Sequence, residues 1–118
     1  MYSDIVKDHF THPRNVGEIE NPDLIGTAKN EADGDQVQLH IKLDGDRIID
    51  VKMKVMGCVA AIASTSLFTE MIKGRTISDA AAVSKEELTA NLGGLPEHKI
   101  RCSLTCIDAL KNAVKKKD

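Results

Sequence analysis

The chain has 118 residues, of which 42% are apolar, and this length and composition fit one globular domain over residues 1–118. Its net charge of −2 is spread along the chain, and one Tyr, two Phe and no Trp argue against nucleic acid as a partner. Because no segment is apolar for long enough to span a bilayer and the first ten residues are too polar for a signal peptide, we expect a cytoplasmic protein without a membrane partner.

A short helix is the first predicted element. Ser3 can cap this helix, which extends to about His12 because Pro13 then interrupts the helical pattern. The sequence from Pro13 to about Asn30 has no regular period. We therefore expect a loop there, followed by an irregular or edge segment.

Two segments of strict alternation follow. The first places Val37, Leu39, Ile41 and Leu43 on one face, and the second places Ile49, Val51, Met53 and Val55 on one face. Between them, Asp44-Gly45 is a turn signal. The pattern predicts two half-buried strands that form an antiparallel hairpin.

The rest of the sequence has a helical period. We expect four helices: one from residue 59 to about Ile72, a short one at 78–83, one that begins at the capping box of Ser84 and Glu87, and a last one that starts near Cys102. Together with the hairpin, these helices predict an α+β fold. In this fold an antiparallel sheet of about three strands is covered on one face by helices.

The predicted hairpin brings acidic residues close to a cysteine. Opposite residues in a hairpin with this turn have numbers that sum to about 90, so Asp33 and Asp35 lie across from residues 55–57. Cys58 follows directly in the sequence. We therefore expect Asp33, Asp35 and Cys58 to cluster at the open end of the hairpin.

Cys58 and Cys102 both stand at predicted helix starts, where backbone N–H groups and the helix dipole favour a thiolate. Lys99 and Arg101 add positive charge near Cys102. A deprotonated thiol in such surroundings is a better metal ligand and a better nucleophile toward persulfide sulfur. Because the chain has three cysteines, an odd number, metal or thiol chemistry is favoured over a disulfide framework.

Each of these residues also has a purely structural interpretation. The Asp33-Gly34-Asp35 run equally fits a turn, and a lone cysteine in an apolar helix, such as Cys106, is more often a small buried hydrophobe than a ligand. Cys106 is about 40° around the helix from Cys102, so it can reach the same site or pack beside it. The residues alone predict a thiolate–carboxylate site, with Cys106 as an additional candidate metal ligand.

Three stretches of the sequence resemble motifs of the IscU/NifU-type iron–sulfur cluster assembly scaffolds. They are Tyr2-Ser3-Asp4 through His12-Pro13-Arg14-Asn15-Val16-Gly17, the run Lys54-Val55-Met56-Gly57-Cys58-Val59-Ala60-Ala61-Ile62-Ala63-Ser64, and Leu95-Pro96 followed by Lys99 and Cys102-Ser103. The stretches follow the family's order over nearly the whole chain. The resemblance therefore implies the fold of that family.

The resemblance also implies a function that is not enzymatic. Scaffolds of this type bind iron and sulfide, build a labile [2Fe–2S] cluster on three cysteines with an aspartate nearby, and transfer it to acceptor apoproteins. Their sulfur comes from a cysteine desulfurase or from free sulfide, and an Hsp70-type chaperone assists release in some systems. By motif, Cys58 and Cys102 match two cluster cysteines, Asp35 matches the aspartate, and Lys99 matches an assisting lysine. Cys102 is then the candidate persulfide acceptor.

The sequence departs from the family pattern at three places. Asp33 stands where the first cluster cysteine is expected, Arg101 stands where a histidine precedes the third, and the chaperone motif Leu-Pro-Pro-Val-Lys reads Leu95-Pro96-Glu97-His98-Lys99. Because a carboxylate is a harder donor than a thiolate, we expect Asp33 to bind iron weakly or to leave its position to water. Two chains can also pool Cys58 and Cys102 around one cluster, which predicts a cluster-bridged homodimer.

Two other functions fit the same residues. One is a persulfide sulfur-relay protein that uses Cys102 and holds no cluster. The other is a zinc-stabilised interaction module, since a mixed set of thiolates and carboxylates suits tetrahedral zinc. Anaerobic reconstitution with iron and sulfide separates both from a cluster scaffold.

Overall fold

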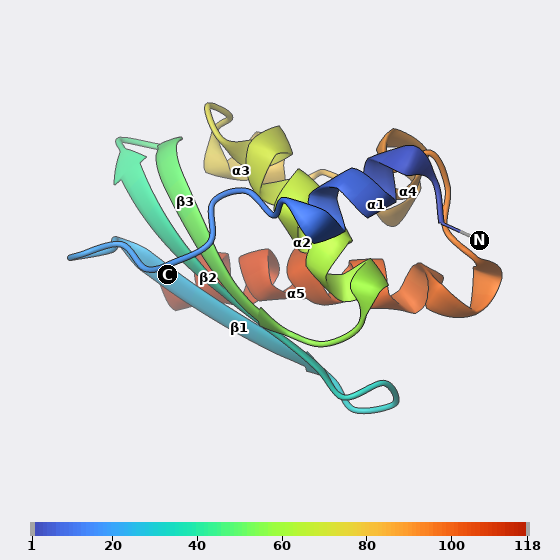
Figure 1. Cartoon of the computed structure of the whole chain (residues 1–118). Coiled ribbons are helices and arrows are strands. Elements are labelled where there is room, and N and C mark those ends of the chain that lie inside the picture. Colours follow the sequence, from blue (N-terminus) through green and yellow to red (C-terminus); the bar gives the residue numbers. More distant parts are fainter. Residues whose placement is uncertain (1, 118) are drawn as a thin grey trace.

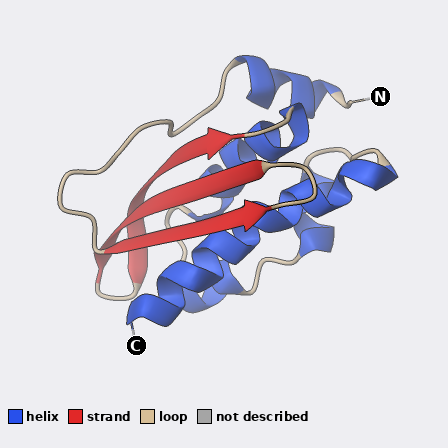
Figure 2. Ribbon diagram, turned by 90° about the horizontal axis from the view of Figure 1, so that it is seen from below, coloured by secondary structure: helices blue, strands red, loops and turns tan. Residues whose placement is uncertain are grey.

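The computed structural model describes residues 2–117. In chain order the elements are α1 (Asp4–Thr11), β1 (Leu24–Asn30), β2 (Asp35–Asp44), β3 (Arg47–Met56), α2 (Val59–Ile72), α3 (Ile77–Ala81), α4 (Lys85–Asn91), the 3₁₀ helix η1 (Glu97–Lys99) and α5 (Ile100–Lys117). The strands form one antiparallel sheet in the order β1-β2-β3, and the helices gather on one of its faces (Figures 1 and 2). The predicted α+β class and three-stranded sheet are confirmed.

The core lies between the sheet and the two longest helices, α2 and α5. The inward side chains of β2 and β3 meet the apolar sides of both helices, and the fully buried ones include Leu39, Ile41, Val51, Phe68, Ile72 and Leu110. Helix α1 packs on α2, and α4 packs on α5. None of the helices in the described part of the chain is long and apolar enough to cross a membrane.

A β-bulge corrects one part of the predicted hairpin. Lys42 pairs with Asp50, but Leu43 pairs with Ile48, so Ile49 is an extra residue on β3. An extra residue reverses the side-chain alternation on its strand. Ile48 is therefore buried, whereas Ile49, which the alternation placed inward, is 49% exposed.

Helix α5 lies unusually close to the edge strand β1. A Cβ atom at Gly26 would overlap the backbone oxygen of Ala109 and the Cβ of Ala113, so only glycine permits this approach. The amide of Asn112 donates a hydrogen bond of 2.8 Å to the backbone oxygen of Thr27 on the same strand. These contacts fix the path of α5, and thereby the position of Cys102 in its first turn.

Candidate metal and sulfur site

Three chain segments meet at the end of the sheet opposite the β2–β3 turn. They are the β1–β2 loop with the start of β2, the connection from β3 to α2, and the first turn of α5 (Figure 1). Each segment contributes one potential ligand: Asp35 is the first residue of β2, Cys58 is the N-cap of α2, and Cys102 lies two residues after the start of α5. The predicted placement of Cys58 and Cys102 at helix starts is confirmed.

The ligand atoms of Asp35, Cys58 and Cys102 all lie within 4.8 Å of one another. The two sulfur atoms are 3.5 Å apart, and Cys58 Sγ is 3.8 Å from Asp35 Oδ2. Tetrahedral coordination with metal–sulfur bonds of about 2.3 Å places ligand atoms about 3.8 Å apart. Asp35 and Cys102 are fully buried, while Cys58 is partly exposed. The three side chains thus have the spacing of a metal site that opens to solvent on the Cys58 side.

The backbone around Cys58 holds the Asp35 carboxylate in place. Its Oδ1 accepts a hydrogen bond of 3.0 Å from the backbone N–H of Cys58, a donor that the first turn of α2 leaves unpaired. A Cβ atom at Gly57 would overlap Oδ1 and Cγ of Asp35. Glycine at position 57 therefore lets the buried carboxylate pack directly on the main chain before α2.

Cys102 differs electrostatically from the sequence-based expectation. Its helix position and the nearby Lys99 and Arg101 favour a thiolate, but burial raises the pKa of the Cys102 thiol, and the adjoining Asp35 carboxylate and Cys58 thiol raise it further. These surroundings favour the protonated form of the Cys102 thiol when no metal is bound. Binding of a metal ion to its sulfur requires release of that proton.

Lys99 supplies positive charge to the site. Coulombic attraction to Cys58 is the largest cause of a raised pKa of Lys99, and attraction to Cys102, Tyr2 and Asp33 adds to it. The attraction is reciprocal, so the Lys99 ammonium favours negative charge on both sulfur atoms. Lys99 belongs to η1, which leads directly into α5.

Asp33 lies beside the three-residue group but is held by other partners. Arg101 Nε donates to its Oδ2 at 2.7 Å, Arg101 Nη2 donates to its Oδ1 at 3.3 Å, and Asn30 Nδ2 donates to Oδ2 at 2.9 Å. The Arg101 guanidinium is the main cause that lowers the pKa of Asp33 to about 2. Cys102 Sγ lies 3.7 Å from Oδ2. The positive charge of Arg101, expected beside Cys102, therefore faces a carboxylate.

The remaining candidate residues lie outside the group in the part of the chain that the structure describes. Cys106 is fully buried one turn after Cys102, its Sγ donates to the Ser103 backbone oxygen at 3.2 Å, and burial raises its pKa to about 12. His98 is exposed on η1. Sequence reasoning missed the pairing of Arg101 with Asp33, for which the only signal was that both positions depart from the family pattern.

The comparisons with known proteins agree with this geometry. Residues 1–117 match the family model described as the NifU-like N terminal domain. The chain is 47% identical over 114 residues to Iron-sulfur cluster assembly scaffold protein IscU 1 of Archaeoglobus fulgidus, covering 97% of this chain and 74% of the relative. It is 43% identical to the IscU scaffold protein of Haemophilus influenzae, with coverage of 96% and 92%.

A solved structure supports the fold independently. The N-terminal part of a NifU-like protein from Brucella abortus superposes with a TM-score of 0.78 over 97% of this chain and 92% of that chain. The sequence identity is 17%, so this likeness concerns the fold alone.

Proposed function

We propose that this chain, which belongs to the family of NifU-like N-terminal domains, assembles an iron–sulfur cluster and passes it on, and that it acts as a scaffold and not as an enzyme. The observation that carries the proposal is the convergence of Asp35, Cys58 and Cys102 from three separate elements within 4.8 Å. The cluster is the cargo of the protein, and a labile [2Fe–2S] form fits this donor set.

The donor set suits a cargo that has to leave again. Two thiolates bind iron firmly, whereas the Asp35 carboxylate is a harder and weaker donor toward iron in a sulfide cluster. Lys99 offsets part of the negative charge that two thiolates and a carboxylate bring to the site. Partial exposure of Cys58 leaves one side of the site open to an incoming or outgoing cluster.

Cys102 is the proposed persulfide acceptor. Cys102 first gives up its proton, and its thiolate attacks the outer sulfur of a persulfide on a cysteine desulfurase. The S–S bond of the donor breaks, and the donor cysteine leaves as a thiolate that takes up a proton. The sulfur gained by Cys102 becomes cluster sulfide when an external reductant, such as a thiol or a ferredoxin, supplies two electrons that cleave the S–S bond. Free sulfide is the alternative source and needs no such reduction. Because Cys102 is fully buried, this step requires the β1–β2 loop or the start of α5 to move.

The partners follow from the same proposal. They are a sulfur donor, acceptor apoproteins that take the cluster, an Hsp70-type chaperone at release, and a second copy of the chain in a cluster-bridged homodimer. The proposal also places the protein in the cytoplasm, since three free cysteines require a reducing compartment to stay available for metal binding.

Zinc is the competing occupant. The distances of 3.5 Å between the sulfur atoms and 3.8 Å from Cys58 Sγ to Asp35 Oδ2 also fit a tetrahedral zinc ion. A zinc-stabilised module would bind zinc in preference to iron and sulfide, and a persulfide relay would carry sulfur on Cys102 without any metal.

Anaerobic reconstitution tests the proposal. The metal-free protein is incubated with ferrous iron and sulfide, desalted, and examined by visible absorption and by Mössbauer spectroscopy. A scaffold gives the visible absorption of an iron–sulfur cluster, and its Mössbauer spectrum shows two iron ions whose spins are coupled to each other. A protein that returns without iron, or that retains only zinc, contradicts the proposal.

A further inference from the structure

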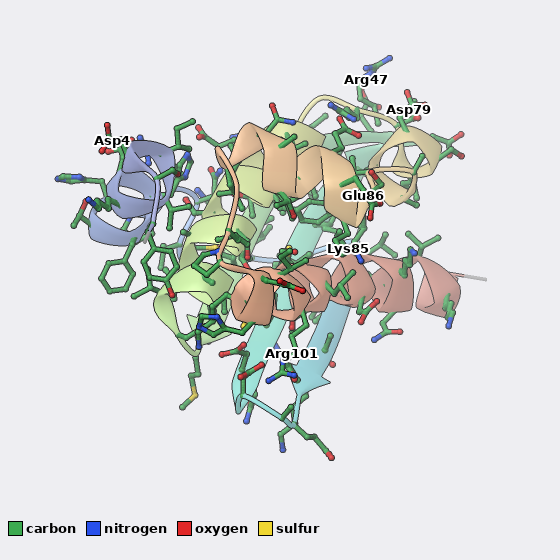
Figure 3. All side chains as sticks on the ribbon, turned by 90° about the vertical axis from the view of Figure 1, so that its right-hand side faces the viewer. Asp4, Arg47, Asp79, Lys85, Glu86 and Arg101 are labelled. Atoms are coloured by element: carbon green, nitrogen blue, oxygen red, sulfur yellow. The ribbon has the colours of Figure 1, made fainter. Side chains whose placement is uncertain are left out.

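Two positions that depart from the family pattern contact each other directly. Asp33 lies in the β1–β2 loop and Arg101 lies in the first turn of α5. Their side chains form a bidentate ion pair, in which Nε donates to Oδ2 at 2.7 Å and Nη2 donates to Oδ1 at 3.3 Å. Figure 3 shows Arg101 at the end of α5, directed toward the ends of β1 and β2. The pair therefore closes the loop that carries Asp33 onto the helix that carries Cys102.

The hydrogen bonds of Asp33 occupy the oxygen that a metal would need. Oδ2 is the Asp33 oxygen that lies 3.7 Å from Cys102 Sγ, and it accepts from both Arg101 Nε and Asn30 Nδ2. The Cys102 thiol is a third and longer donor to the same oxygen, so the two lone pairs of Oδ2 are already in use. Coordination of a metal by this oxygen would require the loss of one of those bonds.

The geometry favours Arg101 as the partner that decides this competition. A planar guanidinium matches both carboxylate oxygens at once, and such a bidentate charged pair is stronger than the single neutral bond from Asn30. The Asp33 side chain is 15% exposed and Arg101 is 57% exposed, so Arg101 approaches from the solvent side. It holds Asp33 at the edge of the site, where the carboxylate contacts Cys102 Sγ at 3.7 Å but is engaged by Arg101.

We propose that Arg101 is a positioning residue that keeps Asp33 out of the coordination sphere. The metal is then held by Asp35, Cys58 and Cys102. One coordination position on the metal is left for a ligand from outside the chain. This inference rests on the proposed function, because it concerns how firmly the same site holds its metal.

Arg101→Gln tests the inference, because it removes the guanidinium and leaves Asp33 with the Asn30 bond alone. Freed from the ion pair, Asp33 can turn its carboxylate toward the metal as an additional ligand. We expect Arg101→Gln to tighten cobalt(II) binding and to slow loss of a reconstituted cluster to excess chelator, each by about tenfold, the lower range of effects of residues that contact metal ligands. The cobalt(II) absorption spectrum changes as well, since its visible bands report coordination number.

A double-mutant cycle assigns the effect to Asp33. Asp33→Asn alone, with Arg101 retained, is expected to bind cobalt(II) as the original chain does. Asp33→Asn combined with Arg101→Gln is expected to lose the gain. Arg75→Gln is the matched control, because it removes an exposed arginine of another ion pair, with Glu87, beyond the far end of α2. Arg101→Met provides a second variant that keeps the aliphatic stem.

Three results would overturn the inference. Unchanged cobalt(II) affinity and spectrum in both Arg101 variants would show that Arg101 does not restrain Asp33. Weaker binding in Asp33→Asn alone would show that Asp33 already coordinates. A gain that persists in the double variant would show that Arg101 acts through another group. If the original chain binds neither cobalt(II) nor a cluster, the proposed function itself fails, which is a separate outcome.

Discussion

Asp33 stands 3.7 Å from Cys102 Sγ, at the position where the family pattern has a cysteine. Asp33→Cys replaces a hard donor by a soft thiolate, which does not form the bidentate pair with Arg101. We expect the variant to lose its cluster to excess chelator about tenfold more slowly, in line with the effect of one ligand contact. Transfer to an apo-ferredoxin is expected to slow as well.

The comparison is made anaerobically on two proteins that both carry a cluster. Because Asp33→Cys also removes the ion pair with Arg101, the urea midpoints of both proteins are measured, so that a change in stability is separated from a change in metal binding. Equal rates of cluster loss would place position 33 beyond reach of the metal. Another residue or a second subunit would then have to complete the site.

Gly57 is a second residue that the site requires, because a side chain at this position would collide with the Asp35 carboxylate. In Gly57→Ala the new Cβ overlaps the Asp35 carboxylate, so the carboxylate or the start of α2 has to move. We expect a loss of unfolding free energy of about 1–3 kcal/mol, typical of overpacking against a buried group, together with weaker cobalt(II) binding. Urea denaturation and metal titration measure the two effects.

The double variant with Asp35→Ala separates overlap from a general backbone effect. Removing the carboxylate removes the atoms that the new methyl group meets, so Gly57→Ala is expected to cost less stability in that background. If the cost is the same with and without Asp35, the overlap is not its cause.

Helix α1 is attached to α2 through a buried histidine. His9 is 5% exposed, its Nδ1 lies 2.8 Å from Ser66 Oγ, and Ser66 Oγ also accepts the backbone N–H of Arg14 at 2.9 Å. The Ser66 hydroxyl hydrogen is therefore available to Nδ1, which must be unprotonated to accept it. Burial is the main cause that lowers the pKa of His9, and the charge of Arg14 lowers it further. The charges of Glu70 and Asp8 raise it by less.

This attachment predicts a loss of stability in acid. A histidine with a lowered folded-state pKa binds more protons when unfolded, so its stabilisation is complete above about pH 6.5 and is lost as the pH falls through the folded pKa. Urea midpoints measured between pH 7.5 and 5 are expected to fall less steeply for His9→Gln than for the original chain. Identical slopes would show that His9 stays neutral or titrates alike in both states.

Strand β1 shows why one element gave little signal in the sequence. Its inward positions are Leu24, Gly26 and Ala28, and the approach of α5 leaves no room for larger side chains at Gly26. Alternation of large apolar residues, which identified β2 and β3, is absent for that reason. The extra residue Ile49 was missed because a bulge depends on pairing between strands and not on the pattern of one strand.

At the scale of the whole molecule, the fold brings together side chains that are far apart in the sequence. The turn predicted from alternation was enough to place Asp35 near Cys58, and the structure confirms this contact. Cys102 joins them only because α5 returns along β1 and β2, a path set by packing between distant elements. For the same reason the ion pair of Asp33 with Arg101, 68 residues apart, could not be derived from local patterns.

We infer that Cys58 and Cys102 hold the cluster, whereas Cys106 belongs to the core. The direct measurement is iron and sulfide content after anaerobic reconstitution of Cys58→Ser, Cys102→Ser and Cys106→Ser, with visible absorption as a second readout. We expect a sharp loss of cluster in the first two variants and near-normal loading in Cys106→Ser, whose fully buried sulfur donates to the Ser103 backbone oxygen at 3.2 Å. Equal loss in all three would make Cys106 a ligand, and full loading of Cys58→Ser or Cys102→Ser would contradict the proposed site.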